Sequence, residues 1–161
     1  MLKRLIPAII FVIALTLINT PGTVSAKEQG EKVSGVAVNT LYFTNCPSPI
    51  GLCGAGTISG GINGTTVGIL YTQKAITKNG VTVAYLYTGT FDVTSANNSV
   101  LHGFTITQID ASNDNVHSTV YFHGGTGQYR HTFGTINLTG TPPGNDQAEH
   151  YTYVGFLTHD N

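Results

Sequence analysis

Histidine and tyrosine are the side chains of this sequence that could bind a small molecule and move a proton. The 161 residues include six His and eight Tyr, but only seven Lys and Arg, eight Asp and Glu, and no Trp. Imidazole is the usual general base near neutral pH, and a tyrosine ring offers apolar surface with one hydroxyl. The candidate ligand-binding residues are Tyr85, Tyr87, His102, Tyr121, His123, Tyr151 and Tyr153.

His102 alternates with the apolar residues Val100, Phe104 and Ile106. This pattern fits either a histidine satisfied within a packed core or a polar group in a ligand pocket. In a pocket, a neutral imidazole could accept a proton from a phenolic or enolic substrate. The tyrosines also fit either a packed core or a ligand pocket. In a packed core, a buried tyrosine commonly finds a local hydrogen-bond partner.

The sequence predicts no metal and no cofactor. It contains no His-x-His pair, and His117 and His123 are six residues apart, which is about 20 Å along a strand. The G-x-S-x-G turn of serine hydrolases is also absent from the sequence. Catalytic residues therefore remain unassigned.

The residues above lie in segments rich in β-branched and aromatic side chains, separated by Gly, Asn and Asp turn signals. No segment has a helical period, and the connections are too short for crossover helices, so we expect an all-β fold, an eight-stranded antiparallel β-barrel. The expected strands are Val33–Thr44, Gly54–Ser59, Thr65–Thr72, Val81–Asp92, Ser99–Gln108, His117–His123, Tyr129–Thr139 and Glu149–Thr158.

Alternation within each strand separates aromatic faces from threonine-rich faces. We expect the aromatic faces, including the His102 face of Ser99–Gln108, to line the barrel and the threonine-rich faces to meet solvent or another subunit. A barrel of eight strands is just wide enough to be filled by side chains or to hold one small ligand. The interior is therefore either a packed core or a pocket.

A glycine-rich segment, Gly124–Gly134, is the most specific motif of the sequence. A phosphate-binding loop is disfavoured because no helix and no lysine follow the glycines. The segment instead predicts a tight hairpin, with Gly125 and Gly127 at positions of positive φ or close backbone approach and Gly134 permitting strong coiling. The residues of the motif are Gly124, Gly125, Thr126, Gly127, Tyr129 and Gly134.

This segment resembles the G-G-[TSA]-G-x-[FY]-x-x-x-x-G hairpin of the dirigent and allene oxide cyclase families. Thr119–Phe122 and Glu149–Phe156 look like the strands that flank that hairpin and close the barrel. The resemblance implies an exported or organellar barrel, usually a trimer, with an apolar cavity and no bound cofactor. Family members steer radical coupling or close rings. The acidic residues proposed for proton transfer in plant members have no counterpart here, so the resemblance does not imply a specific reaction.

The N-terminal 26 residues have the pattern of a signal peptide. Lys3 and Arg4 precede the apolar run Leu5–Ile18, which is too short to cross a bilayer, and Val24-Ser25-Ala26 offers a cleavage site. An uncleaved membrane anchor is the alternative interpretation. After cleavage, residues 27–32 would form a short charged lead and residues 33–161 one domain.

Cys46 and Cys53 would pair in an oxidising compartment and close a short loop, whereas a reducing compartment would leave two free thiols. Export favours the disulfide. We therefore expect a secreted protein, or a periplasmic one in a Gram-negative source.

Charge excludes several partners. After residue 26 the chain has five Lys and Arg, which are scattered, and eight Asp and Glu. Nucleic-acid binding requires clustered cations, and membrane-surface binding usually requires a basic amphipathic stretch. We expect neither nucleic acid nor, after signal cleavage, membrane as a partner.

Two functions fit this sequence. The first is a barrel that binds a small hydrophobic molecule, with a possible role in cofactor-free cyclisation, isomerisation or radical coupling. The second is a non-enzymatic binding or structural module with a filled barrel. A pocket containing paired ionisable groups would favour the first function.

Overall fold

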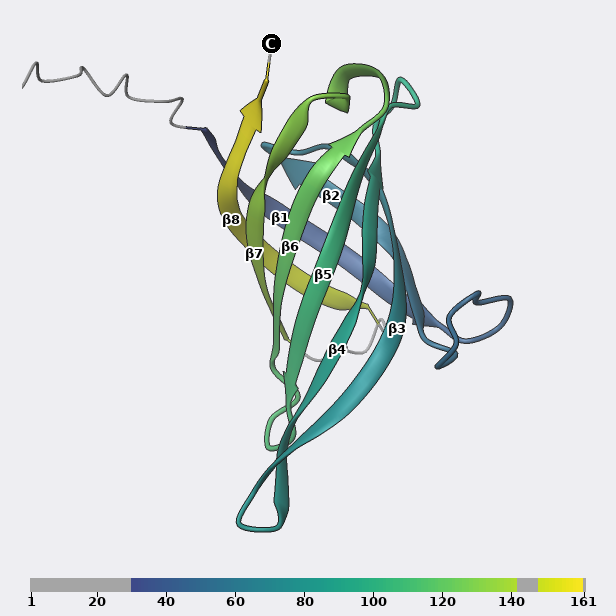
Figure 1. The fold of residues 1–161 in the computed structure, drawn as a ribbon, viewed down its shortest axis with the longest axis vertical. Helices are drawn as coiled ribbons and strands as arrows, with labels where there is room; N and C mark the ends of the chain where they lie inside the picture. The colour runs from purple at the N-terminus through teal and green to yellow at the C-terminus, as the bar shows by residue number, and fades with distance from the viewer. Residues whose placement is uncertain (1–29, 142–147, 161) are drawn as a thin grey trace, which may run out of the picture.

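The computed structural model describes residues 30–141 and 148–160 and confirms the expected fold, a closed antiparallel barrel of eight strands (Figure 1). Among these residues one 3₁₀ turn, η1 (Gly127–Tyr129), lies between two of the strands. The strands are β1 (Glu31–Tyr42), β2 (Cys53–Gly60), β3 (Gly64–Lys78), β4 (Val81–Thr94), β5 (Val100–Asp110), β6 (Val116–Gly125), β7 (Thr132–Thr141) and β8 (Glu149–His159).

Each strand pairs with its neighbour in the sequence, and β8 closes the barrel by pairing with β1. In this closing ladder Tyr153 lies opposite Gly35, and Glu149 lies opposite Asn39. Closure removes the free strand edges that would otherwise pair with other chains.

The β3–β4 hairpin is longer than the sequence predicts and projects beyond the barrel wall (Figure 1). Its turn is Asn79-Gly80, where both residues have positive φ, 53° and 79°. This is the two-residue turn whose twist matches that of paired strands. The predicted strand ended at Thr72 because the polar residues that follow break the apolar alternation, yet β3 continues to Lys78.

The N-terminal predictions are only partly covered by the structure. The proposed signal peptide, residues 1–26, and residues 27–29 of the proposed charged lead lie outside the described residues. Glu31 and Lys32 belong to β1 rather than to a charged lead.

Cys46 and Cys53 form a disulfide, as an oxidising compartment predicts. The bridge spans the loop between β1 and β2. Closing an eight-residue ring stabilises the fold by about 2.5 kcal/mol in the chain-entropy description.

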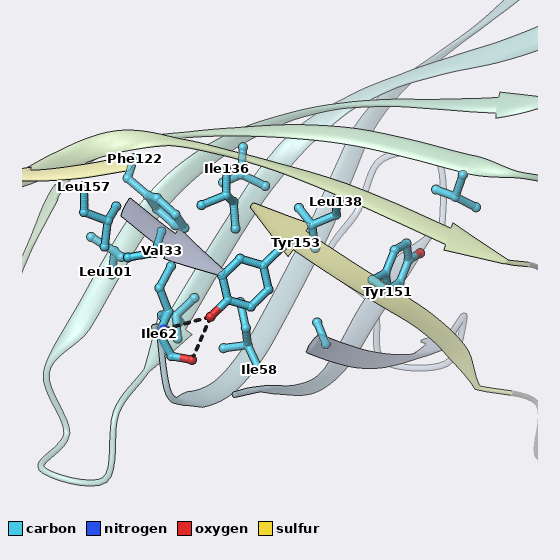
Figure 2. Close-up of a cluster of buried hydrophobic side chains, with 14 residues drawn as sticks. Val33, Ile58, Ile62, Leu101, Phe122, Ile136, Leu138, Tyr151, Tyr153 and Leu157 are labelled. Carbon is cyan, nitrogen blue, oxygen red and sulfur yellow. Dashed lines mark hydrogen bonds between the residues drawn. The ribbon is translucent and has the colours of Figure 1, made fainter. Parts of the chain in front are cut away.

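A cluster of apolar side chains lies inside the barrel and extends from Leu157, near the end of β8, to Tyr151, near its start (Figure 2). At its centre Tyr153, 1% exposed, accepts a hydrogen bond of 2.8 Å from the backbone N–H of Ile62 in the β2–β3 turn. Its ring lies against Gly35, where a Cβ would come within 2.7 Å of the ring. The end of the barrel at the β2–β3 turn is therefore sealed by Tyr153 and this turn.

On β5 the expected faces are reversed. Leu101 and Thr105 are buried, whereas Phe104 and Ile106 are exposed, so the His102 face points out of the barrel. The expectation that this aromatic face lines the barrel is wrong. The β5 face that points inward instead combines the buried Leu101 with Gly103, Thr105 and Thr107, and the threonine hydroxyls are hydrogen-bonded and can be buried at little cost.

The connection between β6 and β7 is less tight than a simple hairpin. β6 ends at Gly125, η1 follows, and β7 begins at Thr132 rather than at the expected Tyr129. Gly127 has a φ of +55°, and a Cβ on Gly125 would lie 1.9 Å from the carbonyl oxygen of Val100. These two glycines therefore have the positive φ and the close backbone approach that the sequence predicts.

Candidate functional site

A cavity of about 90 Å³ lies inside the barrel, bordered in part by the apolar cluster. It lies toward the end where β1 terminates and β8 begins, next to the disulfide loop. Most of its wall is apolar. The lining residues are Ala37, Asn39, Leu41, Leu52, Gly54, Thr66, Gly68, Leu70, Thr90, Phe91, Thr105, Thr107, Ile109, Val116, Ser118, Val120, Leu138, Glu149 and Tyr151.

Two neighbouring residues on the inner face of β8, Glu149 and Tyr151, place a carboxylate and a phenol in the cavity wall. Glu149 is 6% exposed and Tyr151 is 9% exposed. The Tyr151 hydroxyl donates a 2.5 Å hydrogen bond to Oε2 of Glu149. The Tyr151 ring lies against Gly140, where a Cβ would come within 2.3 Å of the ring. The absence of a side chain on β7 thus makes room for this pair.

Hydroxyl groups from β5 and β6 form a second polar part of the wall. Thr107 Oγ1 is hydrogen-bonded to Ser118 Oγ across the two strands, and Thr105 Oγ1 lies 3.3 Å from Thr107 Oγ1. Within the described residues, no buried side-chain polar atom lacks a hydrogen-bond partner. The cavity therefore combines an apolar wall with a few polar groups whose positions are fixed, as small-molecule sites do.

Burial raises the pKa of Tyr151 well above its usual value, and the adjacent negative charge and hydrogen bond of Glu149 raise it further. The phenol therefore keeps its proton and remains a hydrogen-bond donor at any pH near neutrality. Burial also raises the pKa of Tyr153 and of Tyr87.

The raised pKa of Tyr151 predicts a loss of stability in alkali. An unfolded tyrosine ionises near pH 10, whereas folded Tyr151 stays protonated. Above about pH 10 the unfolded state therefore binds fewer protons, and stability falls by about 1.4 kcal/mol per pH unit for this residue. We expect urea midpoints to fall less steeply above about pH 10 in Tyr151→Phe than in the wild type. The exposed Tyr71→Phe variant is the control, and equal slopes in all three proteins would contradict the assignment.

Of the seven predicted ligand-binding residues, only Tyr151 lines the cavity. Tyr153 is buried where the β2–β3 turn seals the barrel and does not line the cavity. Tyr87 is buried on β4, but neither it nor Tyr85 contributes to the cavity wall. Tyr121 is 46% exposed on the outer surface. His102 and His123 also lie outside the barrel.

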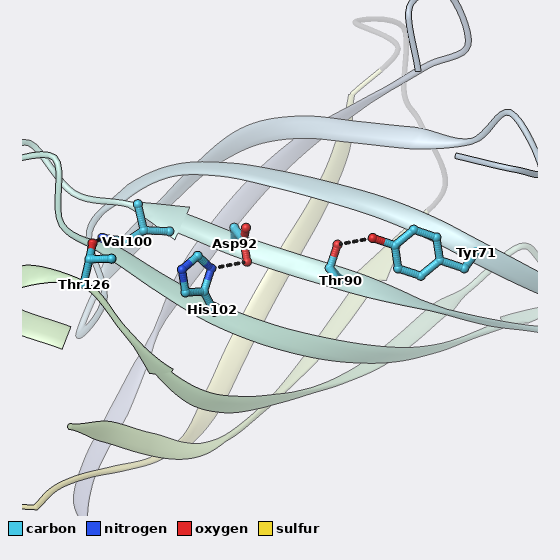
Figure 3. Close-up of polar contacts among 6 residues, drawn as sticks. All are labelled: Tyr71, Thr90, Asp92, Val100, His102 and Thr126. Atoms are coloured by element: carbon cyan, nitrogen blue, oxygen red, sulfur yellow. Dashed lines mark hydrogen bonds and ion pairs between the residues drawn. The ribbon is translucent and has the colours of Figure 1, made fainter. Parts of the chain in front are cut away.

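On that outer surface, His102 Nδ1 lies 3.1 Å from Oδ1 of Asp92 on β4 (Figure 3). The imidazole of His123 stacks on that of His102, with ring centroids 6.4 Å apart. No group of three or more His, Cys, Asp or Glu that could hold a metal ion occurs among residues 30–141 and 148–160. His102 is therefore placed neither in a core nor in the barrel cavity.

The sequence analysis missed Glu149, Thr107 and Ser118 as site residues. Glu149 shares the inner face of β8 with Tyr151 and Tyr153, so the alternation of side chains along this strand could have identified it. Thr107 could not be found in this way, because it belongs to a threonine-rich face that we expect to meet solvent. Ser118 shares its face with Val120 and Phe122, and a lone serine there gives no signal of a site.

Comparisons with protein-family models, with curated proteins and with solved structures found no match to this chain. In the part of the chain that the structure describes, no helix is long and apolar enough to cross a bilayer.

Proposed function

We propose that the barrel binds a small, largely apolar molecule that carries one hydroxyl or carbonyl group. The observation that supports this most strongly is the buried Glu149–Tyr151 pair in the wall of an otherwise apolar cavity. A carboxylate is expensive to bury and is normally retained inside a protein only when it is well hydrogen-bonded. Its place beside open space favours a role toward a ligand over a purely structural one.

The cavity volume limits how such a molecule binds. About 90 Å³ is smaller than the engineered cavity of about 150 Å³ that holds benzene. A ligand would therefore place its polar end beside Glu149 and Tyr151. Its apolar body would lie among three of the four leucines of the cavity wall, Leu41, Leu52 and Leu70. These side chains would have to move apart to admit a ring.

The same pair could support proton transfer without a cofactor. A carboxylate oxygen of Glu149 can accept a proton from an enolic or phenolic group, while the protonated Tyr151 donates a hydrogen bond to a developing oxyanion. These are the two roles required by an isomerisation, by a cyclisation or by steering of a coupling reaction. The alternative is a binding or structural module without chemistry, which the small volume and the apolar cluster inside the barrel favour.

Binding of p-cresol and toluene tests the proposal, because the two molecules differ only in the hydroxyl. We expect p-cresol to shift amide resonances of cavity residues and to bind about tenfold more tightly than toluene, as one hydrogen bond to a charged group predicts. In Glu149→Gln and Tyr151→Phe this preference should shrink. Tyr71→Phe removes a phenol from the outside and should leave it unchanged.

The proposal fails if neither molecule binds at about 10 mM, or if the shifts fall only on outer-surface residues. Binding of both molecules with equal affinity in all variants would leave an apolar site in which Glu149 and Tyr151 have no role toward the ligand.

We further propose that the protein is exported and that its barrels associate with one another. The disulfide supports an oxidising, extracellular type of environment. The outer face of β5–β8 supports association because it exposes large apolar side chains that monomers rarely gather in one patch. These side chains are Phe104, Ile106, Tyr121, Phe133, Val154 and Phe156.

The near absence of charge supports a second copy of this chain as the partner of the outer face of β5–β8. Apart from Asp110 at the end of β5, the described β5–β8 strands place no Asp, Glu, Lys or Arg on this face. A face without charge can be buried against its own copy without desolvating an ion. Charged residues lie on the strands at either side of this face. Lys32 on β1 is opposite Phe156 on β8, and Asp92 on β4 is opposite His102 on β5.

Sedimentation equilibrium tests this association. We expect a wild-type mass about three times that of one chain, since the family resemblance implies a trimer and cyclic assemblies bury such faces. Phe156→Glu places a charge at the most exposed phenylalanine of β5–β8 and should yield monomers. Val67→Glu, on the outer surface of β3, is the matched control. A monomeric wild-type protein at about 50 μM would contradict the proposal.

A further inference from the structure

A second hollow lies at the other end of the barrel, outside the seal formed by Tyr153. Its volume is about 650 Å³, within the range of small-molecule sites. The β2–β3 turn, the β4–β5 turn and η1 form its walls together with the end of β8. Tyr153 and Ile62 are at most 2% exposed and separate this hollow from the barrel cavity. The two sites are therefore independent.

A hydrogen-bonded network holds one wall of the hollow in place. Ser95 Oγ donates to Oδ1 of Asn97, and Asn97 Nδ2 donates to Oε1 of Gln128 at 3.0 Å. The backbone N–H of Gln128 donates to Ser99 Oγ at 3.2 Å. These contacts join two turns that are about 30 residues apart in the chain, so the amide groups are positioned before any ligand arrives.

Some polar groups of the lining remain available to a ligand. Nε2 of Gln128 has no hydrogen-bond partner among the described residues. His159 uses Nδ1 to contact Thr132 Oγ1 at 2.9 Å, and its Nε2 has no partner in the same part of the chain. Tyr129, which is half-buried and packed against the core, adds an aromatic ring to the lining.

The chemistry of this lining points to an uncharged ligand rich in hydroxyl groups. None of the lining residues is Asp, Glu, Lys or Arg, so phosphates, carboxylates and cations find no opposite charge. Amide side chains both donate and accept hydrogen bonds, which matches the dual character of a hydroxyl. An aromatic ring beside them offers apolar surface to the C–H face of a sugar.

We propose that this hollow, defined by Asn63, Asn97, Gln128, Tyr129 and His159, binds a neutral oligosaccharide. The volume suits a short segment of two or three sugar units rather than a single small metabolite. The proposal does not depend on what the barrel cavity binds. A protein with both sites would combine a small apolar ligand inside the barrel with attachment to a carbohydrate outside it.

Calorimetric and NMR titrations of the full-length protein with cellotriose, triacetylchitotriose and maltotriose test this site. We expect at least one of the three to bind and to shift the amide resonances of Asn97 and Gln128. Gln128→Ala removes the side chain but keeps the backbone bond to Ser99, and it should weaken binding about tenfold. Gln73→Ala, an exposed amide on the projecting β3–β4 hairpin, should leave binding unchanged.

Three results would overturn the proposal. The first is that none of the three sugars binds at about 10 mM. The second is that binding occurs but is equal in Gln128→Ala, Gln73→Ala and the wild type, which would place it elsewhere. The third is tighter binding of the charged trigalacturonate than of every neutral sugar, which would contradict the inferred ligand class.

Discussion

Replacing Tyr153 by alanine should destabilise the protein by about 3–5 kcal/mol, the usual cost of deleting a large buried ring. Tyr153 is the largest fully buried side chain and seals one end of the barrel. Its hydroxyl accepts from the Ile62 N–H, and loss of that oxygen alone leaves a buried donor unsatisfied. Tyr153→Phe should therefore cost about 1–3 kcal/mol.

Urea unfolding at neutral pH measures both effects of the Tyr153 substitutions. Tyr71→Ala is the matched control, because Tyr71 is 42% exposed and its hydroxyl makes only a 3.4 Å contact to Thr90. We expect that variant to change stability by less than about 0.5 kcal/mol. Equal losses in Tyr71→Ala and Tyr153→Ala would mean that the barrel is not sealed at Tyr153.

The second large effect is expected at Gly125, where β6 ends. A Cβ at this position would lie 1.9 Å from the carbonyl oxygen of Val100 and 2.9 Å from its carbonyl carbon. Both atoms are backbone, so the clash can be relieved only by separating β5 from β6. Gly125→Ala should cost about 3 kcal/mol, the upper end of the range for overpacking.

Gly68→Ala provides the comparison for Gly125→Ala. A Cβ on Gly68 would meet its nearest atom at an ordinary 3.7 Å, and we expect a change of less than about 0.5 kcal/mol. Whether a glycine in this barrel can be replaced by alanine thus depends on how close the facing backbone lies. If Gly125→Ala has the same urea midpoint as the wild type, the close contact with Val100 is not a feature of the folded protein.

The strand order could be predicted because turn residues separate the strands at regular intervals and no connection is long enough for a crossover. The turn at Asn79-Gly80 and the glycines of the β6–β7 connection are examples in which the backbone needs the residue found in the sequence. These signals are local, and a single sequence contains them.

Which face of each strand points into the barrel could not be predicted with the same success. On β5, alternation offers one face with His102 and Phe104 and another with Gly103 and Thr105, and hydrophobicity favours the wrong one. The choice depends on the space inside a closed barrel, where Tyr151 and Tyr153 of β8 already occupy much of the volume. That constraint arises from strands far apart in the sequence, so alternation within β5 does not contain it.

The candidate site also contains one residue that the sequence predicts and one that it does not. Tyr151 was predicted because the aromatic residues of the last strand share one face. Glu149 lies on that face too, but its importance comes from burial and from the hydrogen bond to Tyr151, which only the three-dimensional structure shows.

A crystal structure of the wild-type protein soaked with p-cresol would test the proposed ligand site most directly. We predict electron density for the ring inside the barrel, among Leu41, Leu52 and Leu70, with the hydroxyl within hydrogen-bond distance of Glu149 or Tyr151. Density for p-cresol only on the outer face of β5–β8, with the barrel interior unchanged, would contradict the proposal that the cavity is a ligand site.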